Sequence, residues 1–263
     1  MNTLNLNPIT QTVRPNFVSE NYGFVQTQPL IELVSSYGWQ VDKITLPKVR
    51  KASREGFQKH QIAFRPNNWG MLLERDGEYP RILLTNSHDR TSALSFNFGW
   101  YRFACDNGLM VGSAFLSAFK VYHSGQHLEV KAREAIEAAL TRFPEVEQCR
   151  QLMRSTLLNA DDIAELTINV NKAVSEIRDF SIQTPLYNIQ RKADTSRDLW
   201  TVFNVLQEQS LGAQTGTKTE IDVTSGEIRS RQLRARKVKS LALDQKINKA
   251  VFDEAYKMLQ KVG

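Results

Sequence analysis

The sequence RILLTNSHDR, residues 81–90, decides the fold, together with the chain that continues from it to VYHSG at residues 121–125. Residues 82–85 form a short apolar run of the kind found in strands. Residues 86–89, Asn-Ser-His-Asp, are residue types that favour turns, because their side chains hydrogen-bond to nearby backbone groups. We therefore predict a strand that ends in a polar turn.

A second strand and a second turn follow directly. Leu94, Phe96 and Phe98 alternate with polar residues at the period of two that is typical of a half-buried strand. The next turn, residues 105–108, ends in Asn-Gly, a pair that tolerates positive φ and closes tight hairpins. We expect residues 109–111 to run back antiparallel to the preceding strand.

The rest of the chain contains patterns of both kinds. Strands are expected at residues 39–46, 60–65, 71–74 and 114–123, and helices at residues 29–34, 126–142, 144–157, 159–174, 196–206 and 243–258. The fold class is therefore α+β, an antiparallel sheet with a strand-strand-strand-helix core followed by several helices. Phage single-strand annealing proteins have the same order of elements, which is a likeness of topology alone.

One domain is predicted behind a polar N-terminal segment. Residues 1–25 are rich in Asn, Thr and Gln, which predicts a flexible arm. Residues 26–263 are expected to form a single α+β domain, with the sheet at about residues 39–125 and the helical part at about residues 126–263. A chain of 263 residues is long enough to bury a sizeable core.

Two segments resemble a known family. Residues 82–112, ILLTNSHDRTSALSFNFGWYRFACDNGLMVG, followed by residues 121–125, resemble the core motif of the phage/plasmid-like protein family of unknown function, which is found on prophages and plasmids. Residues 197–209, RDLWTVFNVLQEQ, resemble the second signature of that family. Arg90 departs from the pattern, because the family usually has Gly there, and the turn is therefore not expected to need a conformation reserved for glycine.

Apolar runs, cysteines and motifs narrow the classes of protein to consider. No run of about 18 apolar residues exists, and residues 1–14 lack the apolar segment of a signal peptide, so neither membrane insertion nor export is expected. Cys105 and Cys149 lie in elements of different kinds, which favours free thiols in the cytoplasm of a host cell. Because no Gly-rich phosphate loop or Walker sequence is present, no ATP-driven role and no cofactor are expected.

Positive charge is concentrated in two segments of a chain whose net charge is +6 and whose pI is ≈ 9.3. The candidate phosphate-binding residues are Lys48, Arg50, Lys51, Arg54, Arg229, Arg231, Arg234, Arg236, Lys237 and Lys239. Such residues bind nucleic acid by neutralising its phosphates. Four aromatic residues become candidates for stacking on unpaired bases if they face solvent: Trp100, Tyr101, Phe103 and Tyr122.

We therefore predict a nucleic-acid-binding protein of a phage or other mobile element. Single-stranded DNA is the favoured ligand, and the most concrete role is strand annealing or protection in recombination or replication. Annealing requires no catalytic residue. It requires neutralised backbones, exposed bases and a homo-oligomer such as a ring or filament.

Two other classes of function are alternatives. The first is an enzyme whose site combines His88, Asp89, Cys105 and His123, either as a metal site that also includes His127 or as a thiol activated by histidine. No paired metal-ligand spacing is present, and such residues more usually serve as turn residues whose side chains bind backbone groups. The second is a counter-defence protein that binds a host protein.

Overall fold

The computed structural model describes residues 7–49, 51–71, 78–102, 119–123, 127–221 and 225–263. The chain forms two compact units, of which the first comprises Met1–Gly108 with Phe115–Pro144 and the second Leu109–Ala114 with Glu145–Gly263. The sequence predicts one domain over residues 26–263. The division differs from that expectation because the C-terminal part has a sheet and a buried core of its own.

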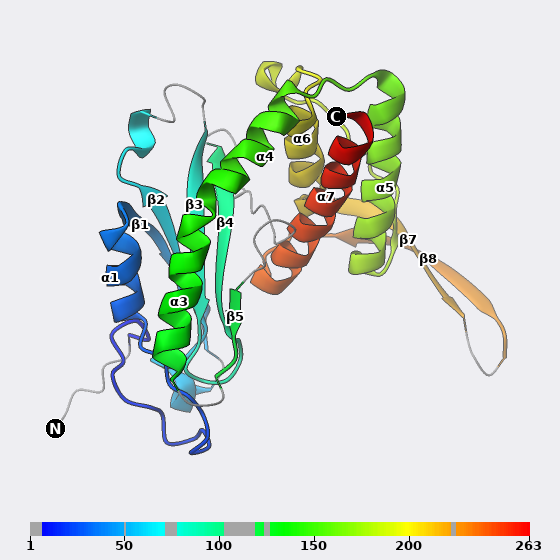
Figure 1. The fold of residues 1–263 in the computed structure, drawn as a ribbon. Helices are drawn as coiled ribbons and strands as arrows, with labels where there is room; N and C mark the ends of the chain where they lie inside the picture. The colour runs from blue at the N-terminus through cyan, green and yellow to red at the C-terminus, as the bar shows by residue number, and fades with distance from the viewer. Residues whose placement is uncertain (1–6, 50, 72–77, 103–118, 124–126, 222–224) are drawn as a thin grey trace. The chain divides into compact units, whose positions relative to one another are not determined.

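The first unit contains a five-stranded sheet in the order β1-β2-β3-β4-β5, in which every neighbouring pair is antiparallel (Figure 1). Its strands are β1 (Trp39–Thr45), β2 (His60–Pro66), β3 (Glu78–Asn86), β4 (Leu94–Arg102) and β5 (Phe119–Val121). Strand β3 ends where the polar turn begins, as the sequence predicts. The short 3-10 helix η1 (Ala52–Arg54) interrupts the connection between β1 and β2.

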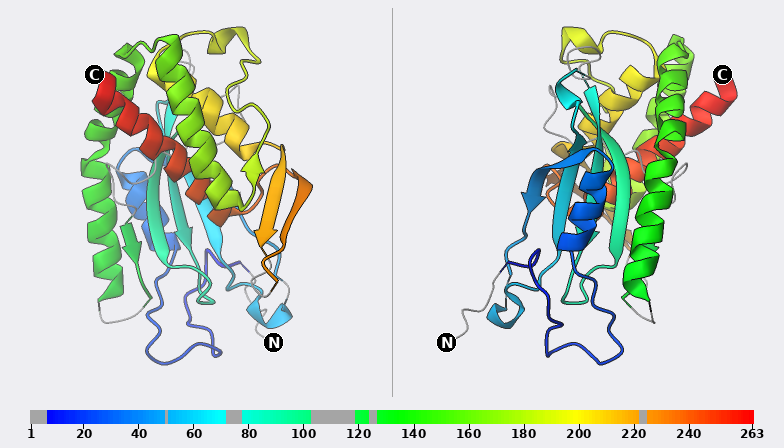
Figure 2. Two further views of the ribbon diagram at one scale, coloured as in Figure 1. Left: turned by 90° about the vertical axis from the view of Figure 1, so that its right-hand side faces the viewer. Right: turned by 60° about the vertical axis from the view of Figure 1, so that its left-hand side comes forward.

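Two helices pack on one face of this sheet, α1 (Gln28–Ser36) against β1 and α3 (Leu128–Thr141) against β4 and β5 (Figure 2, right). Alternate strand residues form the core beneath them, because successive side chains of a strand point to opposite faces. The buried strand residues of this core are Ile62, Phe64, Ile82, Leu84, Phe96 and Trp100.

The N-terminal segment, residues 7–27, packs against the rest of the first unit. Ile9, Val18, Tyr22 and Val25 in this segment are buried. This result differs from the flexible arm expected from the polar composition of residues 1–25. The segment has fixed structure because a few scattered apolar side chains, together with hydrogen bonds from distant residues, compensate for the entropy that an ordered chain loses.

The second unit contains most of α4 (Phe143–Ser155), together with α5 (Ala160–Arg178), α6 (Leu199–Leu211), α7 (Leu241–Val262) and the 3-10 helix η2 (Lys192–Asp194). Helix α7 packs against both α5 and α6, and its Val251 and Phe252 are fully buried. A three-stranded antiparallel sheet in the order β6-β7-β8 completes the unit, with β6 (Ser181–Ile182), β7 (Gln214–Ile221) and β8 (Ile228–Ala235).

The α+β class predicted from the sequence is confirmed, and two local predictions are corrected. Residues 211–228 are rich in Gly and Thr, a composition that predicts a long loop or weak hairpin before the basic run. The structure instead has β7 and β8 paired in a regular eight-pair ladder, which includes Arg229, Arg231 and Arg234. Residues 69–71 are helical, so Met71 does not begin a strand. The rest of the strand expected at 71–74 and the return strand at 109–111 lie outside the described residues.

Candidate functional site

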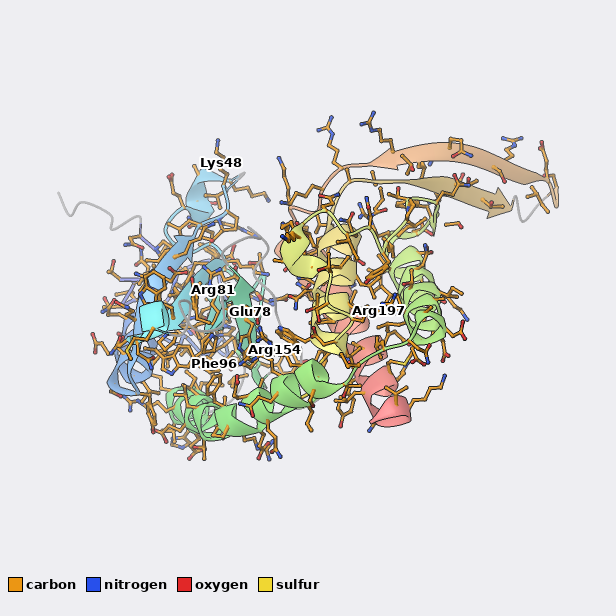
Figure 3. The ribbon with its side chains drawn as sticks, turned by 90° about the horizontal axis from the view of Figure 1, so that it is seen from above. Lys48, Glu78, Arg81, Phe96, Arg154 and Arg197 are labelled. Atoms are coloured by element: carbon orange, nitrogen blue, oxygen red, sulfur yellow. The ribbon has the colours of Figure 1, made fainter. Side chains whose placement is uncertain are left out.

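The hairpin of β7 and β8 carries the denser of the two basic segments. It extends away from helices α5 to α7 of its unit, and β8 is an edge strand (Figures 1 and 3). Arg229, Arg231 and Arg234 lie on β8, while Arg236, Lys237 and Lys239 lie in the segment that connects β8 to α7. All six side chains are exposed. Repeated charge on an edge strand also opposes pairing with a strand of another molecule.

Acidic partners divide these six cations into two groups. Arg229 lies 2.8 Å from Glu227, and Arg231 lies 3.6 Å from Glu220. These ion pairs are exposed and therefore weak, so a phosphate can replace the carboxylate. In the part of the chain that the structure describes, no acidic group lies within ion-pair distance of the other four: Arg234, Arg236, Lys237 and Lys239.

The looser basic segment lines a cleft in the first unit, which we call the lysine cleft. Its volume is about 400 Å³, and the residues that line it are Pro47, Lys48, Val49, Lys51, Arg54, Gln58, Lys59, Asp89 and Thr91. Lys48, labelled in Figure 3, lies on the loop that follows β1. Three of the four candidate cations of this segment, Lys48, Lys51 and Arg54, thus share one cleft. Arg50 lies outside the described residues.

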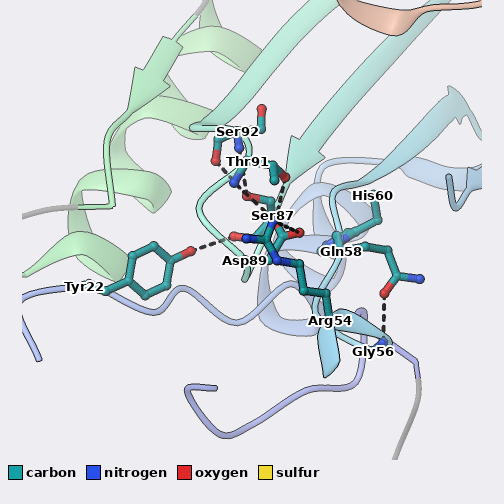
Figure 4. A network of polar contacts seen from close by, with 9 residues as sticks. All are labelled: Tyr22, Arg54, Gly56, Gln58, His60, Ser87, Asp89, Thr91 and Ser92. Carbon is teal, nitrogen blue, oxygen red and sulfur yellow. Dashed lines mark hydrogen bonds and ion pairs between the residues drawn. The ribbon is translucent and has the colours of Figure 1, made fainter. Parts of the chain in front are cut away.

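Asp89 is the one acidic residue of the lysine cleft, and its side chain is only 4% exposed. Its Oδ1 accepts hydrogen bonds from the backbone N–H and the hydroxyl of Thr91, at 3.2 and 2.5 Å (Figure 4). Its Oδ2 lies 4.0 Å from the Arg54 guanidinium, which is 40% exposed. The carboxylate of the predicted turn therefore faces the basic loop, a relation that the sequence spacing does not reveal.

Of the three lysines that line the cleft, Lys59 is the least exposed. Burial lowers the pKa of its ammonium group, and among the described residues no acidic neighbour counteracts that decrease. A half-buried cation without a counter-charge is stabilised when an anion binds beside it. This residue therefore strengthens the case for an anionic ligand in the lysine cleft.

The polar turn at residues 86–89 and His60, which pairs with Asn86, hold the N-terminal segment through buried hydrogen bonds. The Asn86 side-chain amide donates to the Val25 carbonyl and to the Thr27 hydroxyl, each at 3.0 Å. His60 Nδ1 donates to the Gln58 carbonyl at 2.9 Å. Since a neutral imidazole has one N–H, His60 Nε2 must then accept from the Thr27 hydroxyl, which lies 2.7 Å away.

Buried His88 and half-buried His123 bind further points of the same segment. His88 Nε2 donates to the Pro8 carbonyl at 2.8 Å, and His123 Nδ1 donates to the Gly23 carbonyl at 2.9 Å. The Tyr22 hydroxyl donates to the Ser87 carbonyl at 2.7 Å (Figure 4), and the Tyr22 ring stacks on His123. Each of the three imidazoles thus fixes a different part of residues 8–27.

Burial keeps these imidazoles neutral. It lowers the pKa of His60 from 6.5 to about 4 and the pKa of His88 from 6.5 to about 3. The rings of His60 and His88 are 5.1 Å apart, so protonation of one also opposes protonation of the other. Burial likewise lowers the pKa of His123. Neutral rings bound to backbone carbonyls are the arrangement expected of structural histidines.

The structure places three of the four catalytic candidates in one region. His88, Asp89 and His123 belong to the first unit, whereas Cys105 lies outside the described residues. Within the described ranges, no group of three or more His, Cys, Asp or Glu side chains is arranged to hold a metal ion. His127 is exposed and directly precedes α3. Its side chain therefore does not share the buried environment of the other three histidines.

The aromatic candidates differ in their exposure, and the second cysteine is buried. Trp100 is 2% exposed and stacks on Phe143, so it belongs to the core, whereas Tyr122 is 68% exposed. Nothing is described of the Tyr101 and Phe103 side chains. Cys149 is a free, buried thiol, and burial raises its pKa to about 11. That pKa leaves almost no reactive thiolate at neutral pH.

The segment RDLWTVFNVLQEQ has a structural role in the second unit. The Asp198 side chain caps α6 by accepting from the Thr201 backbone N–H at 2.9 Å. Trp200 is buried in the core. The Gln207 amide donates to Asn248 on α7 at 2.6 Å, which ties the two helices together. These contacts give the segment the role of holding α6 and α7 together.

Fold and charge together define an α+β protein with a basic hairpin, a basic cleft and a buried, histidine-bearing turn. The chain belongs to the family described as "Domain of unknown function (DUF932)", which matches residues 16–251. This finding confirms the resemblance to a family of unknown function that was drawn from the turn and the DLW segment. Within the described residues, no helix combines the length and the apolar character that crossing a membrane requires.

Two relatives come from Escherichia coli (strain K12). The UPF0380 protein YfjQ is 28% identical over 250 residues, which cover 93% of this chain and 85% of that protein. The UPF0380 protein YafZ is 31% identical over 195 residues, which cover 72% of this chain and 68% of that protein. No solved structure matches the chain.

The lysine cleft draws together residues that the sequence analysis treated separately. Lys59 and Asp89 both line the cleft, whereas Tyr22, Thr27 and His60 lie outside it: Tyr22 is hydrogen-bonded to the polar turn, and Thr27 to His60. Nothing in their spacing connects them, because they lie on segments that only the folded chain brings together. Asn86 is the residue from which a contact with a distant segment could have been predicted, because a polar residue at the end of an apolar strand often binds backbone groups.

Proposed function

We propose that the protein binds nucleic acid, with single-stranded DNA as the favoured ligand. The observation that carries the proposal is the set of six exposed cations on and after β8, four of which have no acidic neighbour among the described residues. An edge strand that projects from its unit presents such cations to a polymer of phosphates without steric obstruction. The lysine cleft of the first unit supplies a second group of cations.

Strand annealing or protection, in the recombination or replication of a phage or other mobile element, is the role that we propose for this binding. The role requires neutralised phosphates and no reacting side chain, which fits histidines that are bound to backbone carbonyls. Assembly as a homo-oligomer and action in the cytoplasm of a host cell belong to the same proposal.

The test is the salt dependence of binding, measured by fluorescence anisotropy with a labelled single strand. If the six cations of the hairpin each neutralise a phosphate, the logarithm of the affinity falls with the logarithm of salt concentration with a slope of about −4. The variant R234A/R236A/K237A removes three cations without acidic partners and is expected to reduce that slope by about 2.

A matched control removes the same charge elsewhere in the second unit. Lys249, Lys257 and Lys261 are exposed on α7, where each pairs with a carboxylate. The variant K249A/K257A/K261A is expected to retain the wild-type slope. Binding that is absent, insensitive to salt, or reduced equally in both variants would contradict the proposed function.

A further inference from the structure

We propose that the lysine cleft of the first unit binds one phosphorylated nucleotide unit, either at the 5′-phosphorylated end of a single strand or as a free nucleoside monophosphate. The inference rests on the proposed function and makes it more specific, because it distinguishes a terminal nucleotide from the internal backbone. The cations that line the cleft would contact the phosphate, and the polar residues beside them would contact the sugar or base.

The first argument is the balance of charge. Lys48, Lys51, Arg54 and Lys59 all line the cleft, and Asp89 is their one acidic neighbour there. Asp89 is already engaged by Thr91 and Arg54, so it does not neutralise the three lysines. The cleft therefore retains an excess of positive charge that an anion can balance. A phosphate monoester carries more negative charge than an internal diester and fits this excess better.

The second argument is that the loop is held in place before any ligand arrives. The backbone N–H of Arg54 donates to the Lys51 carbonyl at 2.9 Å, which closes the turn of η1. Gly56 has a φ of +84°, and its N–H donates to the Gln58 side chain at 2.8 Å. The Phe57 carbonyl accepts from the N–H of His88 at 2.9 Å, which fixes the loop to the polar turn. Preorganisation reduces the entropy that binding would otherwise lose.

The third argument is size and polarity. A volume of about 400 Å³ lies within the range of small-molecule sites and exceeds what a phosphate ion alone fills. Thr91 and Gln58 line the cleft beside Asp89, so polar groups are available there for a sugar hydroxyl or a base amino group. A carboxylate also disfavours a second phosphate at that position. The cleft thus combines cations that suit a phosphate with polar groups that suit a sugar or a base.

The experiment uses the full chain and a four-nucleotide DNA labelled at its 3′ end, with and without a 5′-phosphate. Such a strand is too short for the hairpin to bind tightly, so the difference between the two probes reports on the phosphate end. The wild-type protein is expected to prefer the phosphorylated probe by about tenfold or more. The variant K48A/K51A changes two exposed lysines and is expected to abolish that preference.

Two controls separate this inference from the proposed function. The variant K131A/R133A removes two exposed cations from α3 of the same unit and is expected to keep the preference. The variant R234A/R236A/K237A is also expected to keep it, even though its binding of long strands is weakened. If long strands bind normally while the two short probes bind equally, the inference is wrong and the proposed function stands.

Competition identifies the source and the class of the ligand. A nucleoside monophosphate that displaces the phosphorylated probe shows that the free nucleotide suffices, whereas displacement by the phosphorylated strand alone identifies the strand end. Both results support the inference. Inorganic phosphate that competes as strongly as the nucleoside monophosphate would overturn it, since the cleft would then recognise a simple anion. An acidic peptide or anionic vesicle that displaces the probe more strongly would also overturn it.

Discussion

At the scale of single residues, Arg90 shows how the turn after β3 is built. Its φ of +67° lies in the left-handed region, which favours glycine. The expectation that this turn has no need of such a conformation is therefore wrong. The arginine occupies a conformation that glycine would adopt at lower energy, and its exposed side chain does not offset the cost by packing.

We predict that Arg90→Gly stabilises the first unit by about 0.5–1 kcal/mol. The left-handed conformation costs an ordinary residue about 1–2 kcal/mol, and the greater freedom of glycine in the unfolded chain cancels about half of that gain. Urea unfolding measures the difference. The matched control is Arg90→Ala, which removes the same side chain but keeps the strained conformation. If Arg90→Gly were no more stable than Arg90→Ala, the cost of the left-handed conformation would be no larger than the entropy that glycine loses on folding, and the prediction would be wrong.

At the scale of elements, the sequence predicts those whose apolar residues repeat. Strands β3 and β4 alternate, and helices α3, α5, α6 and α7 show apolar residues at helical spacing, so their positions agree with prediction to within a few residues. Strand β8 escaped prediction because it is exposed on both faces of a sheet edge. Without a buried face, polar and apolar residues have no reason to alternate.

The candidate site was predictable only in part, because a sequence shows clusters of charge but not contacts between distant segments. Charge runs identified Lys48, Lys51 and Arg54, because clustered cations are visible in any sequence. The partner residues Asp89 and Thr91 were invisible as partners, since the approach of the turn to the loop depends on the pairing of β2 with β3. Long-range contact of this kind leaves no periodic trace in a sequence.

The N-terminal segment supports a prediction about pH, because the buried His60 and His88 and the half-buried His123 hold it. The folded pKa values of His60 and His88, about 4 and about 3, lie below the ordinary value of 6.5. As the pH falls below 6.5, the unfolded chain takes up protons first and gains stability relative to the folded state. The contribution of the two neutral rings to the free energy of unfolding is therefore fully present above about pH 7. It is lost progressively as the pH falls toward their folded pKa values.

At about pH 5, each of these two rings is expected to lower the free energy of unfolding by about 2 kcal/mol. Urea unfolding at neutral and acid pH measures the total, and hydrogen exchange should increase first in residues 8–27. His88→Gln removes the contribution of one ring, so its loss between neutral and acid pH should be smaller than that of the wild type by about 2 kcal/mol. The exposed His127→Gln is the control and should keep the wild-type dependence. A loss that is unchanged in His88→Gln would contradict the assignment.

At the scale of the whole molecule, the net charge of +6 is distributed over two units. Each unit has its own basic surface, the lysine cleft in the first and the hairpin in the second. Two sites on one chain have a consequence that neither has alone. If one strand reaches both surfaces, its binding to one raises its effective concentration at the other, and the combined affinity then exceeds that of either surface alone.

This reasoning predicts that affinity depends on strand length in a stepwise manner. Short strands occupy one surface, and the first length that reaches both should bind about 100-fold more tightly than the next shorter one. The variants K48A/K51A and R234A/R236A/K237A should each abolish the step, because each removes one of the two surfaces that the step requires. K249A/K257A/K261A should retain it. Anisotropy titrations with a series of 5′-phosphorylated strands measure the dependence. An affinity that rises smoothly with length in every variant would mean that the two surfaces bind separate strands.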